Sequence, residues 1–246
     1  MTGRAPGYRR RMLEAAHAAP RWLLCLMGSG EFEPWTSDLE RDLLAAATGD
    51  GSVAIVATAS APEGSTYHAW IDKALDHYAE VGVPAHVADL RGRDDAFRSD
   101  VIAEIERASL VFMSGGNAGY LARALADSAA WDAMRGLLDR GGAIAGCSAG
   151  AMVLGQAAPP RMTADVRTED VEPGLALLPD LWIWPHWSET SEENRERLLE
   201  ITPHDADVLL IDEVTAVVAR DERWETYGRG RAEWIRRATG EGLLAS

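Results

Sequence analysis

The feature that most constrains the fold is an alternation of short apolar runs with longer amphipathic segments. Short, fully apolar runs are typical of buried parallel strands, whereas apolar residues three and four apart indicate helices. The predicted strands cover residues 22–27, 52–58, 85–90, 110–113 and 143–145. The predicted helices cover residues 38–47, 67–81, 101–108, 121–125 and 131–138. This order predicts an α/β fold in which a doubly wound, mostly parallel sheet is flanked by helices.

The rest of the chain is less regular. A polar, loop-like stretch spans residues 156–173, and an apolar strand over 181–187 carries His186 near its end. We expect a charged helix at 191–201, followed by strands at 208–211, 216–219 and 224–227 and a closing segment at 233–237. The sequence has no internal repeat and no linker. It therefore predicts one domain over residues 21–246, preceded by a basic, Ala-rich arm over residues 1–20 with no assigned function.

Composition limits the partners and the compartment. Apolar residues make up 47% of the chain, enough for a sizeable core. The net charge of −15 argues against nucleic acid and anionic membranes as partners. No stretch approaches the roughly 20 apolar residues of a transmembrane helix. The two cysteines, Cys25 and Cys147, make neither a disulfide framework nor a CxxC site, so we expect a cytoplasmic protein.

The most informative motif is the G-x-S-x-G pattern Gly146-Cys147-Ser148-Ala149-Gly150. It lies between a predicted strand and a helix-compatible segment, the context of a nucleophile elbow. So tight a turn needs flanking glycines, because side chains there would collide with the strand and the helix. The serine is then held in a strained conformation, with its hydroxyl above the sheet edge. The Ala149 N–H, at a helix start, is suited to stabilising an oxyanion.

Two other interpretations of this motif stay open. The first is a Gly-rich strand-to-helix turn without chemistry. The second makes Cys147 the nucleophile, as in class I glutamine amidotransferases, which carry a cysteine at such an elbow. However, the glycines bracket Ser148, whereas a frame centred on Cys147 would have Ala145 and Ala149 in their places. Ser148 is the preferred nucleophile, and Cys147 is expected to be a small buried side chain.

Three of the predicted strands are followed by loops with residues suited to a site. These residues are Gly28 and Gly30 after the first strand, Gly115 and Gly116 after the fourth, and Ser148 after the fifth. Ligands of open α/β sheets bind at the carboxyl ends of the strands, so we expect these loops to line one crevice. The turn at Gly28 lacks both phosphate-binding glycine patterns, and we interpret it as plain turn chemistry.

A serine nucleophile needs a base within hydrogen-bond reach, and the base needs an orienting carboxylate. His186 is the strongest of the six histidines, because it follows an apolar strand and a proline. Asp165 is the central candidate for the carboxylate, with Glu169 and Asp170 as alternatives in the same loop. Loop carboxylates of this kind are usually solvated side chains without a catalytic role.

Five segments together carry a family resemblance. They are Gly115-Gly116-Asn117 with Leu121 and Leu125, the elbow over 146–151, Gly174-Leu175-Ala176-Leu177-Leu178-Pro179, Pro185-His186-Trp187 and Ile211-Asp212-Glu213-Val214-Thr215-Ala216. In this order they resemble the pattern of peptidase family S51, which contains dipeptidase E and cyanophycinase. The resemblance spans residues 22–230 or so. It implies a flavodoxin-like fold similar to class I glutamine amidotransferases, with serine in place of their cysteine.

The resemblance also implies catalytic roles. Ser148 would be the nucleophile, His186 the general base and Asp165 the orienting acid, in a Ser, Asp or Glu, His order along the chain. The oxyanion hole would be formed by the N–H groups of Ala149 and of Gly116, or of Gly115 in place of Gly116.

The two named activities imply a cationic substrate site. Dipeptidase E requires an acidic residue before the scissile bond and cyanophycinase cuts β-linked aspartyl-arginine units, so each must hold a carboxylate. The candidate cations are Arg161, Arg167 and Arg195. Of these, we expect Arg195 to bind substrate, together with Asn117. Trp182 and Trp184 share one face of their strand, where core packing is favoured over an aromatic substrate wall.

We therefore expect a serine peptidase or amidohydrolase that needs neither metal nor cofactor. It would cleave a small peptide or an amino-acid amide through an acyl-enzyme. One alternative is a glutaminase-like amidotransferase component, which would use Cys147 and a synthase partner. Another is a binding protein that keeps the fold without the chemistry. The oligomeric state does not follow from the sequence, and a homodimer is one option.

Overall fold

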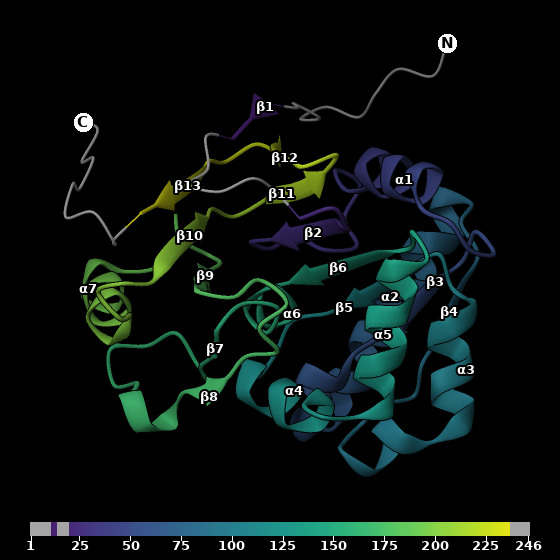
Figure 1. The fold of residues 1–246 in the computed structure, drawn as a ribbon, viewed down its shortest axis with the longest axis horizontal. Helices are drawn as coiled ribbons and strands as arrows, with labels where there is room; N and C mark the ends of the chain where they lie inside the picture. The colour runs from purple at the N-terminus through teal and green to yellow at the C-terminus, as the bar shows by residue number, and fades with distance from the viewer. Residues whose placement is uncertain (1–10, 14–19, 237–246) are drawn as a thin grey trace.

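The computed structural model describes residues 11–13 and 20–236, and its largest feature is an eight-stranded sheet (Figure 1). The strands are β1 Arg11–Met12, β2 Leu23–Met27, β3 Val53–Val56, β4 Ala85–Val87, β5 Leu110–Met113, β6 Ala143–Cys147, β11 Thr215–Arg220 and β12 Arg223–Gly228. Their order across the sheet is β1-β12-β11-β2-β6-β5-β3-β4. The strands from β2 to β4 pair in parallel, and β11, β12 and β1 extend the sheet with antiparallel pairs.

The parallel strands are apolar on both faces because helices cover both. Along β2, Leu24 and Leu26 join one hydrophobic cluster, while Cys25 and Met27 join the other. The helices are α1 Ser37–Ala46, α2 Ser65–Val81, α3 Ser99–Arg107, α4 Ala118–Leu125, α5 Ala129–Asp139 and α6 Ala149–Met152, with 3-10 turns η1 Thr58–Glu63, η2 Asp94–Phe97 and η3 Thr168–Asp170. Buried residues of α1 and α2 pack on the β2 face that carries Cys25, and those of α3, α4 and α5 pack on the opposite face. The predicted α/β fold with a doubly wound sheet is confirmed.

The antiparallel edge has a local cause. Strands β11 and β12 are joined by Asp221 and Glu222, whose φ angles are 51° and 59°. Positive φ at both central residues is the geometry of a tight hairpin turn, and so short a connection permits only antiparallel pairing. The sequence predicts these strands at nearly the observed positions, whereas the predicted strand over 85–90 forms only over Ala85–Val87.

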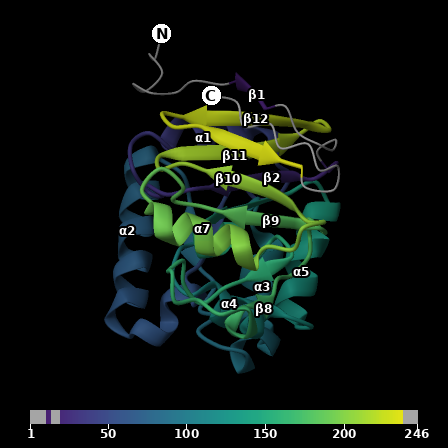
Figure 2. The same cartoon turned by 90° about the vertical axis from the view of Figure 1, so that its left-hand side faces the viewer.

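A smaller sheet stands beside the main one. It contains β9 Leu181–Trp184, β10 Asp207–Ile211 and β13 Ala232–Ile235, with β10 in the middle. Helix α7 Glu192–Ile201 connects β9 to its parallel neighbour β10 and lies against this sheet (Figures 1 and 2). A short pair, β7 Ala157–Ala158 and β8 Glu172–Pro173, lies near α4. The segment after β9 contacts the turn that follows β6, and the segment after β10 contacts the segment after β9.

Two further observations concern the ends of the chain and its helices. Most of the predicted arm over 1–20 lies outside the described residues, apart from the pairing of β1 with β12. The extent of the domain over 21–246 stays a prediction. Within the described ranges, no helix has both the length and the apolar composition needed to cross a bilayer.

Candidate active site

Ser148 lies in the turn between β6 and α6, at the carboxyl end of the parallel strands. Its φ of 52° and ψ of −112° are unfavourable for a residue with a side chain. The flanking glycines make the turn sterically feasible. A Cβ at Gly146 would lie 2.1 Å from the Gly150 carbonyl oxygen, and a Cβ at Gly150 would lie 2.2 Å from the Met113 carbonyl oxygen. The glycine spacing is therefore a steric requirement of this turn.

His186 comes from the smaller sheet and reaches Ser148. Its Nε2 lies 2.9 Å from Ser148 Oγ, across a separation of 38 residues in the sequence. The turn after β9 is fixed by the Thr190 N–H and hydroxyl, which donate to the His186 carbonyl oxygen at 3.0 and 2.8 Å. The Trp187 N–H donates to the Ile211 carbonyl oxygen at 3.0 Å and ties the turn to the end of β10. The structure thus brings the predicted nucleophile and base together.

Glu213 completes a chain of hydrogen bonds. Its Oε1 lies 2.5 Å from His186 Nδ1, on the ring nitrogen opposite the one that faces Ser148. The Glu213 N–H donates to Ser188 Oγ at 3.1 Å, and the Val214 N–H donates to Ser29 Oγ at 3.0 Å, so hydrogen bonds on both sides hold the loop. The His186 and Glu213 side chains are 40% and 20% exposed, which leaves the imidazole accessible to a small molecule. A hydroxyl, an imidazole and a carboxylate in this order can perform nucleophilic catalysis.

The structure does not place Asp165 beside His186. Its carboxylate is 73% exposed and bonds to Thr163 Oγ1 at 2.5 Å and to the Arg161 guanidinium. The Thr163 hydroxyl and the Arg161 guanidinium lower the pKa of Asp165, as expected of a stabilised surface carboxylate. The alternatives Glu169 and Asp170 pair with Arg167. All three therefore belong to a surface network, and the carboxylate that the structure places beside His186 is that of Glu213.

Glu213 could have been found from the sequence by the same signal that identified His186. It lies two residues after the apolar run 208–211, which makes up most of β10. The segment 211–216 was already part of the family resemblance, although no role followed from that. Because β9 and β10 are parallel neighbours, their carboxyl ends bring His186 and Glu213 together.

The predicted oxyanion donors lie next to Ser148. A Cβ built on Gly115 would be 3.4 Å from Ser148 Cβ and 3.8 Å from its Oγ. Gly116 has a φ of 138° and presses so closely on Ala59 that a Cβ would lie 2.4 Å from its carbonyl oxygen. Among the described residues, the N–H groups of Gly116 and Ala149 have no acceptor, whereas that of Gly115 donates to a carboxylate. The two unpaired N–H donors thus belong to the residues that directly follow Gly115 and Ser148.

The predicted substrate-binding residues make contacts within the protein. Asn117 Oδ1 accepts a hydrogen bond from the Tyr120 N–H at 2.8 Å and caps α4. Arg195 donates from Nε and Nη2 to the Trp187 carbonyl oxygen at 3.0 and 2.5 Å, and its guanidinium stacks 5.2 Å from the Trp187 ring centre. Their roles in substrate binding stay predictions. Trp182 and Trp184 are 7% and 1% exposed, which confirms core packing as their role.

Cys147 is buried beneath the turn. Its Sγ donates to Glu31 Oε2 at 3.0 Å, and the thiol has no accessible surface. Burial raises the pKa of Cys147 well above its ordinary value, and the nearby Glu31 carboxylate raises it further. A buried neutral thiol is a poor nucleophile, so the geometry disfavours the alternative in which Cys147 is the nucleophile.

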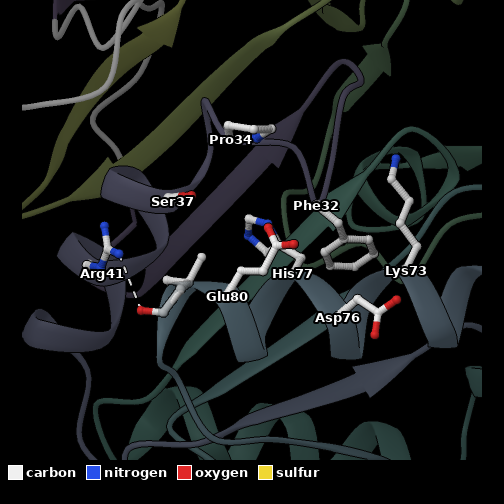
Figure 3. A pocket seen from close by; sticks show the side chains of 9 residues that line it. Phe32, Pro34, Ser37, Arg41, Lys73, Asp76, His77 and Glu80 are labelled. Carbon is white, nitrogen blue, oxygen red and sulfur yellow. Dashed lines mark hydrogen bonds between the residues drawn. The ribbon is translucent and has the colours of Figure 1, made fainter.

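A separate hollow of about 330 Å³ lies between α1 and α2 (Figure 3). Its lining residues are Phe32, Pro34, Ser37, Arg41, Lys73, Asp76, His77, Glu80 and Val81. Beside it His77 Nε2 lies 2.6 Å from Glu40 Oε2, in a pair that is almost completely buried. None of Ser148, His186 and Glu213 lines this hollow. In the described part of the chain, no group of three or more His, Cys, Asp and Glu side chains could hold a metal ion.

Solved structures and curated sequences resemble this chain. A crystal structure of a peptidase from an acI-B1 Actinobacterium matches with a TM-score of 0.80 and 25% identity, covering 93% of this chain and 95% of that one. A putative peptidase E protein from Listeria monocytogenes EGD-e shares the fold, with a TM-score of 0.62 and 17% identity over 87% of this chain and 98% of that one.

Cyanophycinases from Trichormus variabilis and Nostoc sp. are each 29% identical over 166 residues, or 62% of this chain. The match covers 54% of the length of each of these relatives. The family model of peptidase family S51 matches residues 24–227, which include Ser148, His186 and Glu213. Since that match extends over most of the sequence, the chain belongs to peptidase family S51.

Proposed function

We propose that this protein is a serine hydrolase that cleaves the amide bond of a small peptide or an amino-acid amide. The observation that carries the proposal is the continuous hydrogen-bond chain from Ser148 through His186 to Glu213. Membership of a peptidase family and similarity to cyanophycinases support an amide substrate.

Acylation would begin at Ser148. Its Oγ attacks the carbonyl carbon of the substrate while His186 Nε2 takes the hydroxyl proton. The Glu213 carboxylate holds the imidazole in the tautomer with the proton on Nδ1 and stabilises the imidazolium that forms. As the C–N bond breaks, the same proton moves from Nε2 to the leaving amine. An ester between Ser148 and the acyl group remains.

The negative oxygen that develops during attack needs hydrogen-bond donors. The unpaired N–H groups of Gly116 and Ala149 would supply them, and the start of α6 adds the positive end of its peptide dipoles. Donors fixed in place before the reaction act mainly on the transition state and therefore raise kcat.

Deacylation would use the same groups in reverse. A water molecule gives a proton to His186 Nε2 and attacks the ester carbonyl carbon. The proton then returns to Ser148 Oγ as the C–O bond breaks, and a carboxylic acid leaves. One bond is hydrolysed per cycle, and no oxidant or reductant is consumed.

Labelling with a fluorophosphonate tests the nucleophile without knowledge of the substrate. Intact mass spectrometry should detect one adduct on the wild type and on Cys147→Ala, and none on Ser148→Ala. Labelling that persists in Ser148→Ala, or that disappears in Cys147→Ala, would contradict the proposal. No labelling of folded wild type would favour a binding protein that has lost the chemistry.

A substrate screen tests the reaction itself. Dipeptides with α- and β-linked Asp, their N-blocked forms and glutamine form a suitable panel. Ser148→Ala should lower turnover of the best substrate by about 10⁴- to 10⁶-fold without loss of the fold, as judged by circular dichroism. Glutamine hydrolysis that survives in Ser148→Ala but not in Cys147→Ala would instead favour a glutaminase.

A further inference from the structure

Glu31 is a buried carboxylate beside the nucleophile, and the proposed reaction gives it no role. It lies in the loop after β2 and is 4% exposed. Its Oε1 accepts a hydrogen bond from the Gly115 N–H at 3.3 Å, and its Oε2 accepts one from Cys147 Sγ at 3.0 Å. Gly115 directly precedes Gly116, and Cys147 directly precedes Ser148. One side chain therefore bonds to both segments from which the proposed reaction takes its nucleophile and an oxyanion donor.

The contact is close enough to fix the spacing of these segments. A Cβ on Gly115 would meet Glu31 Oε1 and Ser148 Cβ at the same distance, 3.4 Å. Gly115 thus lies next to both the carboxylate and the serine. Because its N–H points to Glu31, it is not free to bind an oxyanion, and the N–H of Gly116 is left for that role.

The same loop also reaches the segment that carries Glu213. A Cβ at Gly28 would lie 2.1 Å from the Asp212 carbonyl oxygen, so only glycine allows this approach. The Gly28 N–H donates to the Thr215 carbonyl oxygen at 2.8 Å, and Ser29 Oγ accepts from the Val214 N–H. Gly28 allows this close backbone packing, which anchors the loop while Glu31 extends towards the elbow.

We propose that Glu31 is a positioning residue that holds the Gly115–Gly116 turn at the correct distance from Ser148. The proposal rests on the proposed function, because it concerns the oxyanion hole of that reaction. A buried carboxylate is costly unless its oxygens are hydrogen-bonded, so both bonds should persist in the folded protein. Their loss would let the Gly116 N–H move, and oxyanion stabilisation depends on donor distances near 3 Å.

The test compares three substitutions by fluorophosphonate labelling of Ser148, with the rate measured at several probe concentrations. Glu31→Ala removes both hydrogen bonds. Glu31→Gln keeps an oxygen for the Gly115 N–H, and its amide can donate to Cys147 Sγ. Glu40→Gln is the matched control, because it alters a carboxylate that is 1% exposed and bonded to His77 and Tyr78, away from the elbow.

Glu31→Ala should lower the maximal labelling rate by about 10²-fold, the cost of losing an oxyanion donor, with probe affinity almost unchanged. Glu31→Gln should restore most of that rate. Glu40→Gln should label at the wild-type rate when equal amounts of folded protein are compared. If Glu31→Ala fails to fold, the labelling rate of Glu31→Gln decides the question. A Glu31→Gln variant that labels no better than Ser148→Ala would overturn the proposal. A folded Glu31→Ala that labels at the wild-type rate would also overturn it. Failure of the wild type to label would count against the proposed function, not against the role of Glu31.

Discussion

At the residue scale, Glu213 and Asp165 differ in that Glu213 contacts the proposed base and Asp165 belongs to the surface. Both are acidic loop residues, yet only Glu213 lies at hydrogen-bond distance from His186. Asp165 is mostly exposed and is held by Thr163 and Arg161. Replacing each carboxylate by the corresponding amide should therefore change kcat/KM for Glu213 but not for Asp165.

Glu213→Gln should lower kcat/KM by about 10²- to 10⁴-fold, because the amide cannot stabilise the imidazolium by charge. Steady-state kinetics on the best dipeptide would measure the loss. Asp165→Asn is the matched control and should leave kcat/KM unchanged. Equal losses in the two variants would contradict the assignment of Glu213.

The two predicted site residues that the structure brings together carry local signals in the sequence. Ser148 is marked by its flanking glycines, which the turn requires for steric reasons, and His186 by the strand and proline before it. Glu213 also lies just beyond an apolar run, but that signal does not by itself place the carboxylate beside His186. Its place depends on which strand becomes the neighbour of β9, and that follows from packing of the whole chain.

At the element scale, close contacts between backbones restrict which residues the strand-turn-helix unit of β6 and α6 can carry. Gly150 packs directly against the end of β5, where the Met113 carbonyl oxygen leaves no room for a Cβ. Gly136, inside α5, has only the Nη1 of Arg140 within 4 Å of such a Cβ, at 3.2 Å. A flexible side chain can move away, whereas a strand cannot.

Gly150→Ala should therefore lower the free energy of unfolding by about 1–3 kcal/mol or more, the usual cost of overpacking. Gly136→Ala should raise it by up to about 1 kcal/mol, since alanine is the better helix former. Urea unfolding followed by circular dichroism measures both changes. Similar shifts in the two variants would mean that the turn relaxes more freely than its contacts indicate.

Prediction of the elements from sequence was limited by what periodicity can encode. The strand expected at 110–113 forms as Leu110–Met113, and the helix expected at 67–81 forms as Ser65–Val81. Apolar runs do not reveal the sheet to which a strand belongs. Strands β10 and β11 are separated by three residues in the chain, yet they belong to different sheets. The loop between them, which carries Glu213, could therefore not be placed in advance.

At the scale of the whole molecule, the site is formed where the two sheets meet. Ser148 comes from the main sheet, and His186 and Glu213 come from the smaller one. Leu24 of the main sheet and Trp182 and Leu209 of the smaller one belong to one hydrophobic cluster, so a shared core fixes their relative position. Conditions that weaken global stability should also disrupt the catalytic geometry.

Alkaline pH is such a condition, because Cys25 and Cys147 are both buried. Burial raises the pKa of each thiol, with further contributions from Glu40 at Cys25 and Glu31 at Cys147. In the unfolded chain, the pKa of a cysteine thiol is about 8.5. Above that pH the unfolded state binds fewer protons than the folded state, so the free energy of unfolding must fall as pH rises. The slope should approach about 1.4 kcal/mol per pH unit for each thiol.

Urea unfolding at pH 7 to 10 under reducing conditions measures this slope, and the Cys25→Ala/Cys147→Ala double variant should lose less stability over this range. Equal slopes for the double variant and the wild type would show that other groups, such as the tyrosines, dominate alkaline unfolding.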